Sequence, residues 1–397
     1  MITEKIMLKN SERFEKPHYI SREKLIRAAE RATNKLEALS KKCGDGFPRA
    51  CSFDYKYIPD ENKDWVGGLY TGCFWLAYEI TGNEFFRKEA ERHMPVYEKR
   101  FEEKIGLTGH DVGFPYTPSC VAQYKITGNE KARKLALDVA DFFLKNAYKS
   151  SGKYHFISRN KVPDEYNSFR TMMDTLMNMG LLFWAGIQTG ESRFTKAALD
   201  QSVTCKDLLI RADGSSYHHY MFDAQTQEPM RGLTFQGHAD ESCWSRGHAW
   251  GVYGFPLAYS YTKADFLPEL HQGVTYFMLN HLPEDCIPYW DYDFTDGDEP
   301  RDASAGVISA CGMMEMASLL SESNPDKNIF INAADMILDS TIDRCTGDIG
   351  VEYDGLICHV THSIPHNVGI DGCAPYADFF YLEALARKLN PDFKKYW

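Results

Sequence analysis

The chain has 397 residues, of which 44% are hydrophobic and 14% aromatic, and its formal net charge is −12. This length permits a large buried core, and a closed barrel of repeats can extend over such a length as one domain. The acidic, mixed charge argues against a nucleic-acid partner and against an anionic membrane surface. No apolar stretch approaches the length of a membrane span, so we expect no membrane-spanning segment.

The N-terminal segment and the cysteines favour a cytoplasmic protein. The first residues, MITEKIMLKNSERFEK, lack the uninterrupted apolar core of a signal peptide. The 11 cysteines are scattered, odd in number and without a C-x-x-C pair. We therefore expect reduced, mostly buried thiols and a cytoplasmic location.

A phrase repeats along the chain. It occurs as AYEITGNEFFRKEAERHM at 77–94, as QYKITGNEKARKLALDVADFFL at 123–144 and as AGIQTGESRFTKAALDQSVTCKDLL at 185–209. In each copy an apolar helix ends at Thr-Gly, where the glycine provides a left-handed C-cap, and a polar or acidic residue opens an amphipathic helix. Weaker copies follow at 260–279 and 319–338. Each copy predicts a hairpin of an inner and an outer helix.

The series of hairpins predicts an all-α fold, an (α/α)6 barrel with about six inner and six outer helices. Helices near 21–42 and 376–389 would complete the ring. An open solenoid is less favoured, because its turns are short and even, whereas long loops rich in Gly, Pro, Tyr and His separate these hairpins. We expect residues 1–397 to form a single barrel domain with a short N-terminal extension at about 1–20.

Loops before the expected inner helices carry candidate site residues. In NKDWVGG, Trp65 lies just before an inner helix. In GHDVGFPYTPS, His110 and Asp111 precede a helix for which we expect Thr117 as N-cap and Pro118 in the first turn. Because loops at one end of the inner helices share the mouth of the barrel, these side chains should line one pocket.

Two later segments add to the same mouth. CWSRGHAW places Arg246 and Trp250 four residues apart on one helical face, with Trp244 nearby. Gln236 lies a few residues earlier, and RADGSSYHHYMFD is a turn followed by aromatic residues and two histidines. Aromatic surfaces with hydrogen-bonding side chains are how a pocket holds a sugar ring, and an arginine can grip a carboxylate through two hydrogen bonds.

Asp174 stands in TMMDTLMNM, an apolar run that we expect to be an inner helix. A carboxylate loses its hydration in such surroundings, so its pKa should be raised and its proton retained near neutrality. With Asp111 it would supply two carboxyl groups for acid and base catalysis. The structural alternative is a buried strut in which Asp174 accepts hydrogen bonds from Arg170 or Asn178.

The other candidates also have structural interpretations. The alternative role of the histidine and aspartate of HDVGF is to form a turn and a helix cap and nothing more. Arg246 can be a structural ion-pair partner, and tryptophans are often core residues. CHVTHSIPH brings His359, His362 and His366 close in sequence. Without a paired Asp, Glu or Cys at a defined offset, we expect no metal there and no cofactor. The functional interpretation rests on the candidates occurring together.

Four segments occur in an order that points to one enzyme family. They are HDVGF, RTMMDTLMNMGLLFWAG, CWSRGHAWGVYGF and RDASAGVISACGMMEM. They resemble the unsaturated glucuronyl hydrolases of glycoside hydrolase family 88, and the resemblance extends from about Trp65 to YADFFYLEAL. Members of that family fold as (α/α)6 barrels. The resemblance implies a single catalytic domain that removes the non-reducing unsaturated (4,5-dehydro) glucuronic acid from oligosaccharides released by polysaccharide lyases, glycosaminoglycan disaccharides above all.

The resemblance also implies roles for individual residues. Asp174 matches the catalytic aspartate of the family, and Asp111, beside His110, matches its second essential aspartate. The substrate-contacting residues of the family match Trp65, His218, Gln236, Trp244, Arg246 and Trp250. One departure is visible, because the helix motif usually reads Arg-Gly-Gln-Ala-Trp and His248 replaces the glutamine here.

The implied reaction is hydration of a vinyl ether rather than displacement at the anomeric carbon. Asp174 would protonate C4, water would add at C5, and the resulting hemiketal would open and release the remaining oligosaccharide. Asp111 would hold ring hydroxyls, and its charge would favour a protonated Asp174. Family members that act on sulfated disaccharides share a basic, serine-bearing C-terminal loop, and the matching loop at 361–371 keeps Ser363 and has no lysine.

Three alternatives stay open at this point. An unsaturated rhamnogalacturonyl hydrolase shares the barrel and the pair of aspartates, although CWSRGHAW and HDVGF favour the glucuronyl enzyme. A sugar epimerase would need a histidine pair placed to move a ring proton, and Asp174 would have no clear role. In a sugar-binding or scaffold barrel, Asp111 and Asp174 could become Asn with no loss beyond binding.

Overall fold

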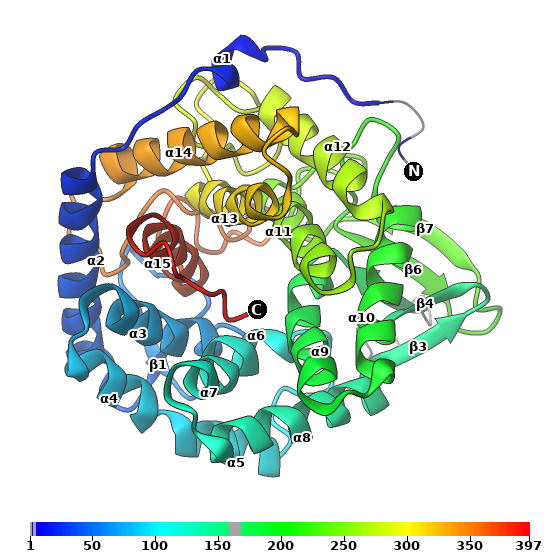
Figure 1. The fold of residues 1–397 in the computed structure, drawn as a ribbon, viewed down its shortest axis with the longest axis horizontal. Coiled ribbons are helices and arrows are strands. Elements are labelled where there is room, and N and C mark those ends of the chain that lie inside the picture. Colours follow the sequence, from blue (N-terminus) through cyan, green and yellow to red (C-terminus); the bar gives the residue numbers. More distant parts are fainter. Residues whose placement is uncertain (1, 3–4, 159–167) are drawn as a thin grey trace.

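A closed ring of apolar helices forms the centre of the computed structural model, which describes residues 2, 5–158 and 168–397 (Figure 1). In this described part the inner helices are α3 (Gly67–Thr81), α6 (Gly113–Tyr116) continued by α7 (Ala122–Thr127), α9 (Thr175–Thr189), α11 (Ser245–Thr262), α13 (Ala303–Leu319) and α15 (Pro375–Leu389). Each inner helix packs on the next, and α15 packs on α3, so the ring closes. The predicted all-α (α/α)6 barrel is confirmed.

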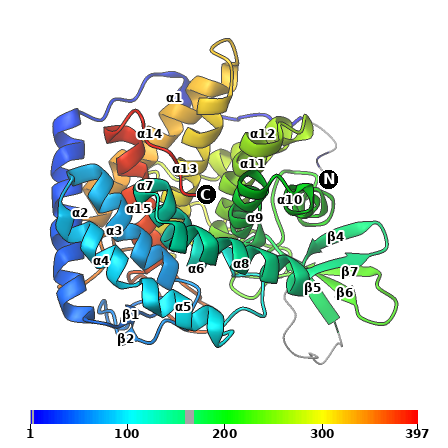
Figure 2. The same cartoon turned by 60° about the horizontal axis from the view of Figure 1, so that its bottom comes forward.

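An outer layer of amphipathic helices surrounds this ring (Figures 1 and 2). Within the described residues it consists of α2 (Arg22–Cys43), α4 (Glu84–Arg92) with α5 (Met94–Glu102), α8 (Glu130–Ala147), α10 (Ser192–Thr204), α12 (Phe266–Asn280) and α14 (Pro325–Cys345). On α8, for example, Leu135, Val139 and Phe143 recur at four-residue spacing and are buried. This spacing places them on one helical face, which packs toward the inner ring.

The Thr-Gly turns between inner and outer helices form as the repeats predict. Gly82, Gly128 and Gly190 directly follow α3, α7 and α9, and their φ angles are +67°, +71° and +73°. Glycine adopts this left-handed conformation without the steric cost of a Cβ. The side chains of Asn83 and Asn129 then accept hydrogen bonds from the first backbone N–H groups of α4 and α8. The repeated phrase therefore ends one helix and begins the next.

In the described part of the chain, three small antiparallel sheets lie in the long loops, and the all-α prediction did not include them. The strand β1 (Phe47–Pro48) pairs with β2 (Pro59–Asp60), and β3 (Tyr148–Ser151) pairs with β4 (Tyr154–Ile157). In the third sheet β6 (His219–Asp223) lies between β5 (Ser168–Met172) and β7 (Pro229–Leu233). This sheet projects beside α9 and α10 (Figure 2).

Two predictions of local structure are wrong. The segment expected to begin a helix at Thr117 is already helical from Gly113, and Thr117–Val121 form a π-helical turn between α6 and α7. Pro118 has no N–H group for the regular ladder, so a wider turn occurs there. Asp174 does not lie within a helix but at the N-cap of α9, because the residues before it pair as β5 with β6.

Residues 5–21, which precede α2, follow the outside of the barrel (Figure 1). The short helix α1 (Glu12–Glu15) packs on α14, and Arg13 donates hydrogen bonds to the carbonyls of Leu282 and Pro283. Phe14 is fully buried. Residues 1, 3 and 4 of the predicted extension lie outside the described residues.

Packing also bears on the expectations from composition. All 11 cysteines are free and ten of them are buried, as expected for reduced thiols. Among the helices of the described residues, none combines the length and the apolar character that crossing a membrane requires.

Glycines let neighbouring inner helices approach closely. At five contacts around the ring, an added Cβ would lie 2.5 Å or less from an atom of the adjacent helix; these glycines are Gly68, Gly72, Gly113, Gly254 and Gly312. In three of them the nearest atom belongs to the backbone, which cannot move without a shift of the whole helix. The diameter of the inner ring therefore depends on these positions.

Gly312→Ala should destabilise the barrel. The new Cβ would lie 2.5 Å from the Val252 carbonyl oxygen and 2.7 Å from the Tyr253 Cα. We expect the free energy of unfolding to fall by about 2 kcal/mol or more, despite the better helix propensity of alanine. Urea denaturation measures this, with Gly347→Ala as the control, because no atom lies within 4 Å of its added Cβ. Equal stabilities of the two variants would contradict the role of Gly312.

Candidate active site

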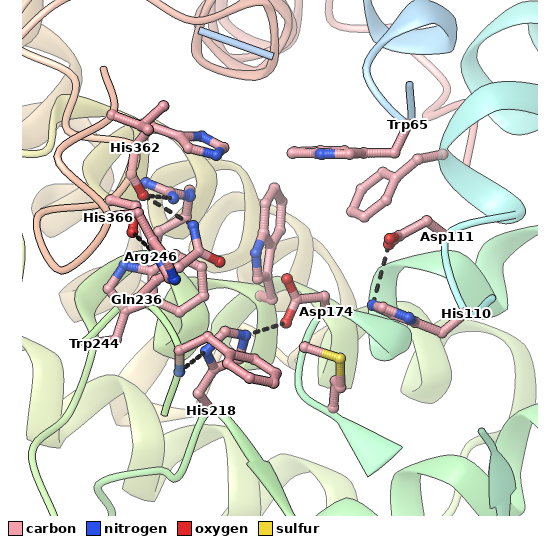
Figure 3. Close-up of a pocket in the computed structure, with 16 residues that line it drawn as sticks. Trp65, His110, Asp111, Asp174, His218, Gln236, Trp244, Arg246, His362 and His366 are labelled. Atoms are coloured by element: carbon pink, nitrogen blue, oxygen red, sulfur yellow. Dashed lines mark hydrogen bonds and ion pairs between the residues drawn. The ribbon is translucent and has the colours of Figure 1, made fainter. Parts of the chain in front are cut away.

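One pocket of about 450 Å³ gathers the predicted site residues (Figure 3). All nine line it: Trp65, His110, Asp111, Asp174, His218, Gln236, Trp244, Arg246 and Trp250. Seven other lining residues were not among these candidates: Phe114, Met172, Phe235, His362, Ser363, His366 and Val368. Met172 and Phe235 lie within two residues of one of the nine, and Phe114 lies three residues after Asp111, so proximity in sequence was the available signal for these three.

Asp174 lies on one side of the pocket, beside His218 (Figure 3). Its side chain is only 17% exposed, and its Oδ2 lies 3.6 Å from Nε2 of His218. The backbone N–H of Phe235 donates to Nδ1 of the same ring at 3.2 Å. Since that nitrogen accepts, a neutral His218 carries its proton on Nε2, toward Asp174.

Asp111 lies across the pocket from His218, and its Oδ1 is 3.3 Å from Nε2 of the buried His110 (Figure 3). Asn178 links this segment to Asp174. Its Oδ1 accepts a hydrogen bond from the Phe114 N–H at 2.8 Å, and its Nδ2 donates to the main-chain carbonyl of Asp174 at 3.2 Å. One buried amide therefore sets the positions of both acidic segments relative to each other.

Aromatic rings form the apolar part of the pocket. Trp65 stacks on Tyr376 with 5.3 Å between ring centroids and an interplanar angle of 16°. Phe114 lies 5.0 Å from Trp65 and 5.2 Å from Trp250. Trp244 lies 4.5 Å from the ring of His218. These faces suit the C–H side of a sugar ring, and their mutual packing holds them in place.

Arg246 is buried, and its guanidinium is used mainly within the protein. Nη1 donates to Asp302 and to the Thr361 carbonyl, both at 2.7 Å, and Nη2 donates to the His362 carbonyl at 2.6 Å. Three of the four terminal N–H groups thus have protein acceptors. Arg246 therefore acts as a structural ion-pair partner of Asp302, and the predicted two-bond grip on a substrate carboxylate stays a prediction for its Nε–H and second Nη2–H groups.

Asp302 is a residue that the sequence reasoning missed. It is fully buried, it caps the N-terminus of α13, and its Oδ1 accepts hydrogen bonds from the backbone and hydroxyl of Ser304. Burial raises the pKa of Asp302, and the adjacent Arg246 opposes that rise. Its only sequence signal was its place in RDASAG before an inner helix.

The loop 361–371 forms one wall of the pocket through His362, Ser363, His366 and Val368. Burial, aided by the charge of Arg246, lowers the pKa of His362 to about 3, so this ring is neutral. His359 lies apart from the pocket and pairs with Asp371 at 2.8 Å, which raises the pKa of His359 to about 10. Within the described residues, no group of three or more His, Cys, Asp or Glu is placed to hold a metal ion.

Several inner helices begin at this pocket. Trp65 and Asp174 directly precede or cap α3 and α9, Arg246 is in the first turn of α11, and Asp302 caps α13. Helix N-termini carry a partial positive charge from their unpaired N–H groups. In a chain of net charge −12, this gives the pocket a local field that favours an anionic ligand.

The chain matches the sequence model of Glycosyl Hydrolase Family 88 over residues 41–293. It belongs to this family. It is 35% identical over 391 residues to the unsaturated chondroitin disaccharide hydrolase of Streptococcus pneumoniae, with 98% of each chain covered. The protein is therefore a glycoside hydrolase.

Two crystal structures extend this similarity to the fold. Unsaturated glucuronyl hydrolase from Streptococcus agalactiae matches with a TM-score of 0.94 at 34% identity, over 100% of this chain and 99% of that one. An aspartate-to-asparagine variant of that enzyme, complexed with dGlcA-GalNAc6S, matches with a TM-score of 0.88 at 33% identity, over 100% of both chains.

In this family 88 hydrolase, His248 replaces the glutamine of the usual helix motif. Its side chain lies behind the pocket. It is fully buried, with Nε2 2.8 Å from the Val274 carbonyl and Nδ1 3.0 Å from the Ser216 hydroxyl. Nε2 must donate to the carbonyl, so Nδ1 accepts from Ser216, two residues before His218. Burial lowers the pKa of His248 to about 4, which keeps this bridge neutral.

His248→Gln should reduce the loss of stability in acid. The folded-state pKa of about 4 lies below the ordinary histidine pKa of about 6.5, so below pH 6.5 the unfolded chain binds a proton that the folded chain does not. Between pH 7 and pH 5 this costs the wild type about 2 kcal/mol of unfolding free energy, which the variant should retain. Urea denaturation at both pH values measures it. The exposed His238→Gln is the matched control, and an identical pH profile for both variants would contradict the assignment.

Asp302→Asn should be strongly destabilising. It removes the carboxylate partner of a buried guanidinium, which typically costs about 3–5 kcal/mol. The matched control is Asp60→Asn. The Asp60 carboxylate forms an exposed ion pair with Arg49 at 2.8 Å, so this substitution should lower the free energy of unfolding by less than about 1 kcal/mol. Urea denaturation compares the two. A cost below 1 kcal/mol for Asp302→Asn would mean that Arg246 does not depend on this partner.

Proposed function

We propose that this hydrolase removes the non-reducing unsaturated (4,5-dehydro) glucuronic acid from small oligosaccharides left by polysaccharide lyases, with glycosaminoglycan disaccharides as its main substrates. The observation that carries the proposal is the placement of Asp174 and Asp111 in one aromatic pocket at the helix N-termini. The similarity to an unsaturated chondroitin disaccharide hydrolase favours this substrate class over pectin-derived rhamnogalacturonyl disaccharides.

In the proposed reaction Asp174 donates its proton to C4 of the C4=C5 vinyl ether. Water then adds at C5 and loses its proton to the carboxylate that has just formed. The product is a hemiketal at C5, whose ring opens to a ketone, and the bond from C1 to the remaining oligosaccharide breaks to release an alcohol. The Nε2–H of His218, 3.6 Å from Asp174, is placed to stabilise the carboxylate between these two proton transfers.

The other pocket residues bind and orient the sugar in this proposal. Asp111, supported by His110, accepts hydrogen bonds from ring hydroxyls. Trp65, Trp244 and Trp250 supply apolar faces, and Gln236 holds the His362 carbonyl at 2.9 Å as part of the wall. The uronate carboxylate is attracted by the helix N-termini and by the charge of Arg246.

The proposal extends to the whole chain. We infer that residues 1–397 act as one catalytic domain with a short extension before about residue 20. The proton transfers above need only carboxyl groups and water, so the reaction requires no cofactor. The partner is a small oligosaccharide, and the cytoplasmic location stays a prediction from the sequence.

Asp174→Asn should bind substrate without converting it. Ultraviolet absorbance of the C4=C5 bond reports the reaction on unsaturated chondroitin and hyaluronan disaccharides, non-sulfated and 6-sulfated. The wild type should abolish this absorbance, and kcat of the variant should fall by about 100-fold to 10,000-fold, because asparagine cannot donate a proton to carbon. Calorimetric titration should give a Kd for the variant within a few-fold of the wild-type KM.

Two results would count against the proposal. Normal turnover by Asp174→Asn would refute its role as the proton donor. A wild type that leaves glycosaminoglycan disaccharides intact but consumes pectin-derived unsaturated disaccharides would establish the rhamnogalacturonyl activity instead.

A further inference from the structure

A second hollow lies at the opposite end of the barrel from the active site, where inner helices end. Its volume is about 660 Å³, and none of its lining residues lines the active-site pocket. Lys125, Tyr261, Leu319 and Lys388 line it from the last turns of α7, α11, α13 and α15. We call it the far-end hollow. The proposed reaction, which takes place at the helix starts, uses none of its residues.

Basic side chains outnumber acidic ones around the far-end hollow. The chain as a whole has 44 Lys and Arg against 56 Asp and Glu. The hollow reverses this balance, because its lining includes two acidic side chains, Glu315 and Asp335, and six basic ones: Lys125, Lys327, Arg387, Lys388, Lys394 and Lys395. Such a concentration of one sign of charge in a hollow attracts ligands of the other sign.

Ion pairs hold one wall of the far-end hollow in place. Arg387 has a side chain only 11% exposed, and its Nη1 and Nη2 donate to Oε2 of Glu315, both at 3.0 Å. Lys395 donates to Oε1 of the same carboxylate at 2.6 Å. Lys388 pairs with Asp335 at 2.7 Å. This wall is therefore formed before any ligand arrives, which lowers the entropic cost of binding.

The pKa of Glu315 indicates that positive charge is in excess at this wall. Burial by itself would raise the pKa of this carboxyl, but the charges of Arg387 and Lys395 hold it below its ordinary value. The ends of the inner helices carry a partial negative charge, which the basic side chains also offset. Because a buried carboxylate stays ionised here in spite of both effects, a further anion in the hollow is also favoured.

Three of the lysines have N–H groups available for a ligand. Lys394 is exposed, and no carboxylate of a described residue forms an ion pair with it. Lys125 donates to the main-chain carbonyls of Lys395 and Tyr396, both at 2.9 Å, which leaves its third N–H. Lys327 pairs with Glu322, whose side chain is 91% exposed, and exposed partners of this kind are exchanged at little cost.

The shape and the remaining lining of the far-end hollow indicate the class of ligand. A phosphate or sulfate group has three acceptor oxygens, which suit N–H donors that converge from several side chains. The rings of Tyr261 and Phe393 are partly buried and line the same hollow. Such rings pack against the C–H side of a sugar. A volume of about 660 Å³ is within the usual range for small-ligand sites.

We propose that the far-end hollow is a second ligand site, which binds a sugar that carries a phosphate or sulfate group. The oxyanion accepts hydrogen bonds from Lys125, Lys327 and Lys394, and the sugar ring lies against Tyr261 and Phe393. The two sites share no lining residue, so this inference does not depend on the proposed function.

Calorimetric titration of glucose 6-phosphate and of N-acetylgalactosamine 6-sulfate into the full chain tests the proposal. At low salt at least one of them should bind with a Kd of about 1 mM or lower, and glucose should not bind. The sugar that binds more tightly identifies phosphate or sulfate as the preferred group. Lys394→Glu and Lys327→Gln should each weaken binding by at least about fivefold. Lys41→Glu, which reverses the charge of an exposed lysine on α2, is the matched control and should change Kd less than twofold.

Two results would overturn the far-end site. If neither sugar binds at concentrations up to about 10 mM, the basic side chains serve only to offset the helix ends and the carboxylates of Glu315 and Asp335. If a sugar binds with a Kd that both Lys394→Glu and Lys327→Gln leave unchanged, its site lies elsewhere. Urea denaturation of the two variants confirms that they are folded, as expected for the exposed Lys394. Turnover of unsaturated disaccharides is a separate measurement, so either failure leaves the proposed function to its own test.

Discussion

The common direction of the inner helices is the constraint on which the active site depends. Asp174 stands at the N-cap position of α9, Asp302 caps α13, and Trp65 and Arg246 stand near the start of two other inner helices, so segments far apart in sequence meet at one end of the barrel. Close packing at glycines such as Gly312 fixes the spacing of these helix starts. The same arrangement directs several positive helix ends at the pocket, which offsets the net charge of −12 where an anionic uronate would bind.

A buried ion pair connects this ring to the loop that forms one pocket wall. Arg246 begins α11, Asp302 begins α13, and the remaining N–H groups of Arg246 hold the carbonyls of Thr361 and His362. Taking two charges out of water is costly, and these additional hydrogen bonds offset that cost. These hydrogen bonds fix the backbone of the loop at Thr361 and His362, and a binding site for a small sugar requires such fixed positions.

Burial also sets the protonation of the histidines around the pocket. His362 and His248 have pKa values lowered to about 3 and about 4, so both are neutral near pH 7. Each neutral ring has one donor and one acceptor nitrogen, which gives it a definite orientation. The orientation of the His218 ring is fixed by contacts as well, because Nδ1 accepts the hydrogen bond from the Phe235 N–H and Nε2 faces Asp174. The pocket thus combines oriented neutral imidazoles with carboxyl groups, a suitable setting for proton transfer.

The sequence by itself determined the helical hairpins and the composition of the pocket. Thr-Gly caps act through neighbouring residues only, and residues shortly before an inner helix lie at a barrel end, so candidates such as Trp65 and Asp111 could be placed at the pocket from the sequence. The features that depend on contacts between distant segments were decided only by the tertiary structure. Pairing of β5 with β6 moved Asp174 from a helix interior to a helix start, and carbonyls more than 100 residues away took up the guanidinium of Arg246. The approach of the 361–371 loop to residues 47–64 arises in the same way, because no local pattern records which distant segments will pack together.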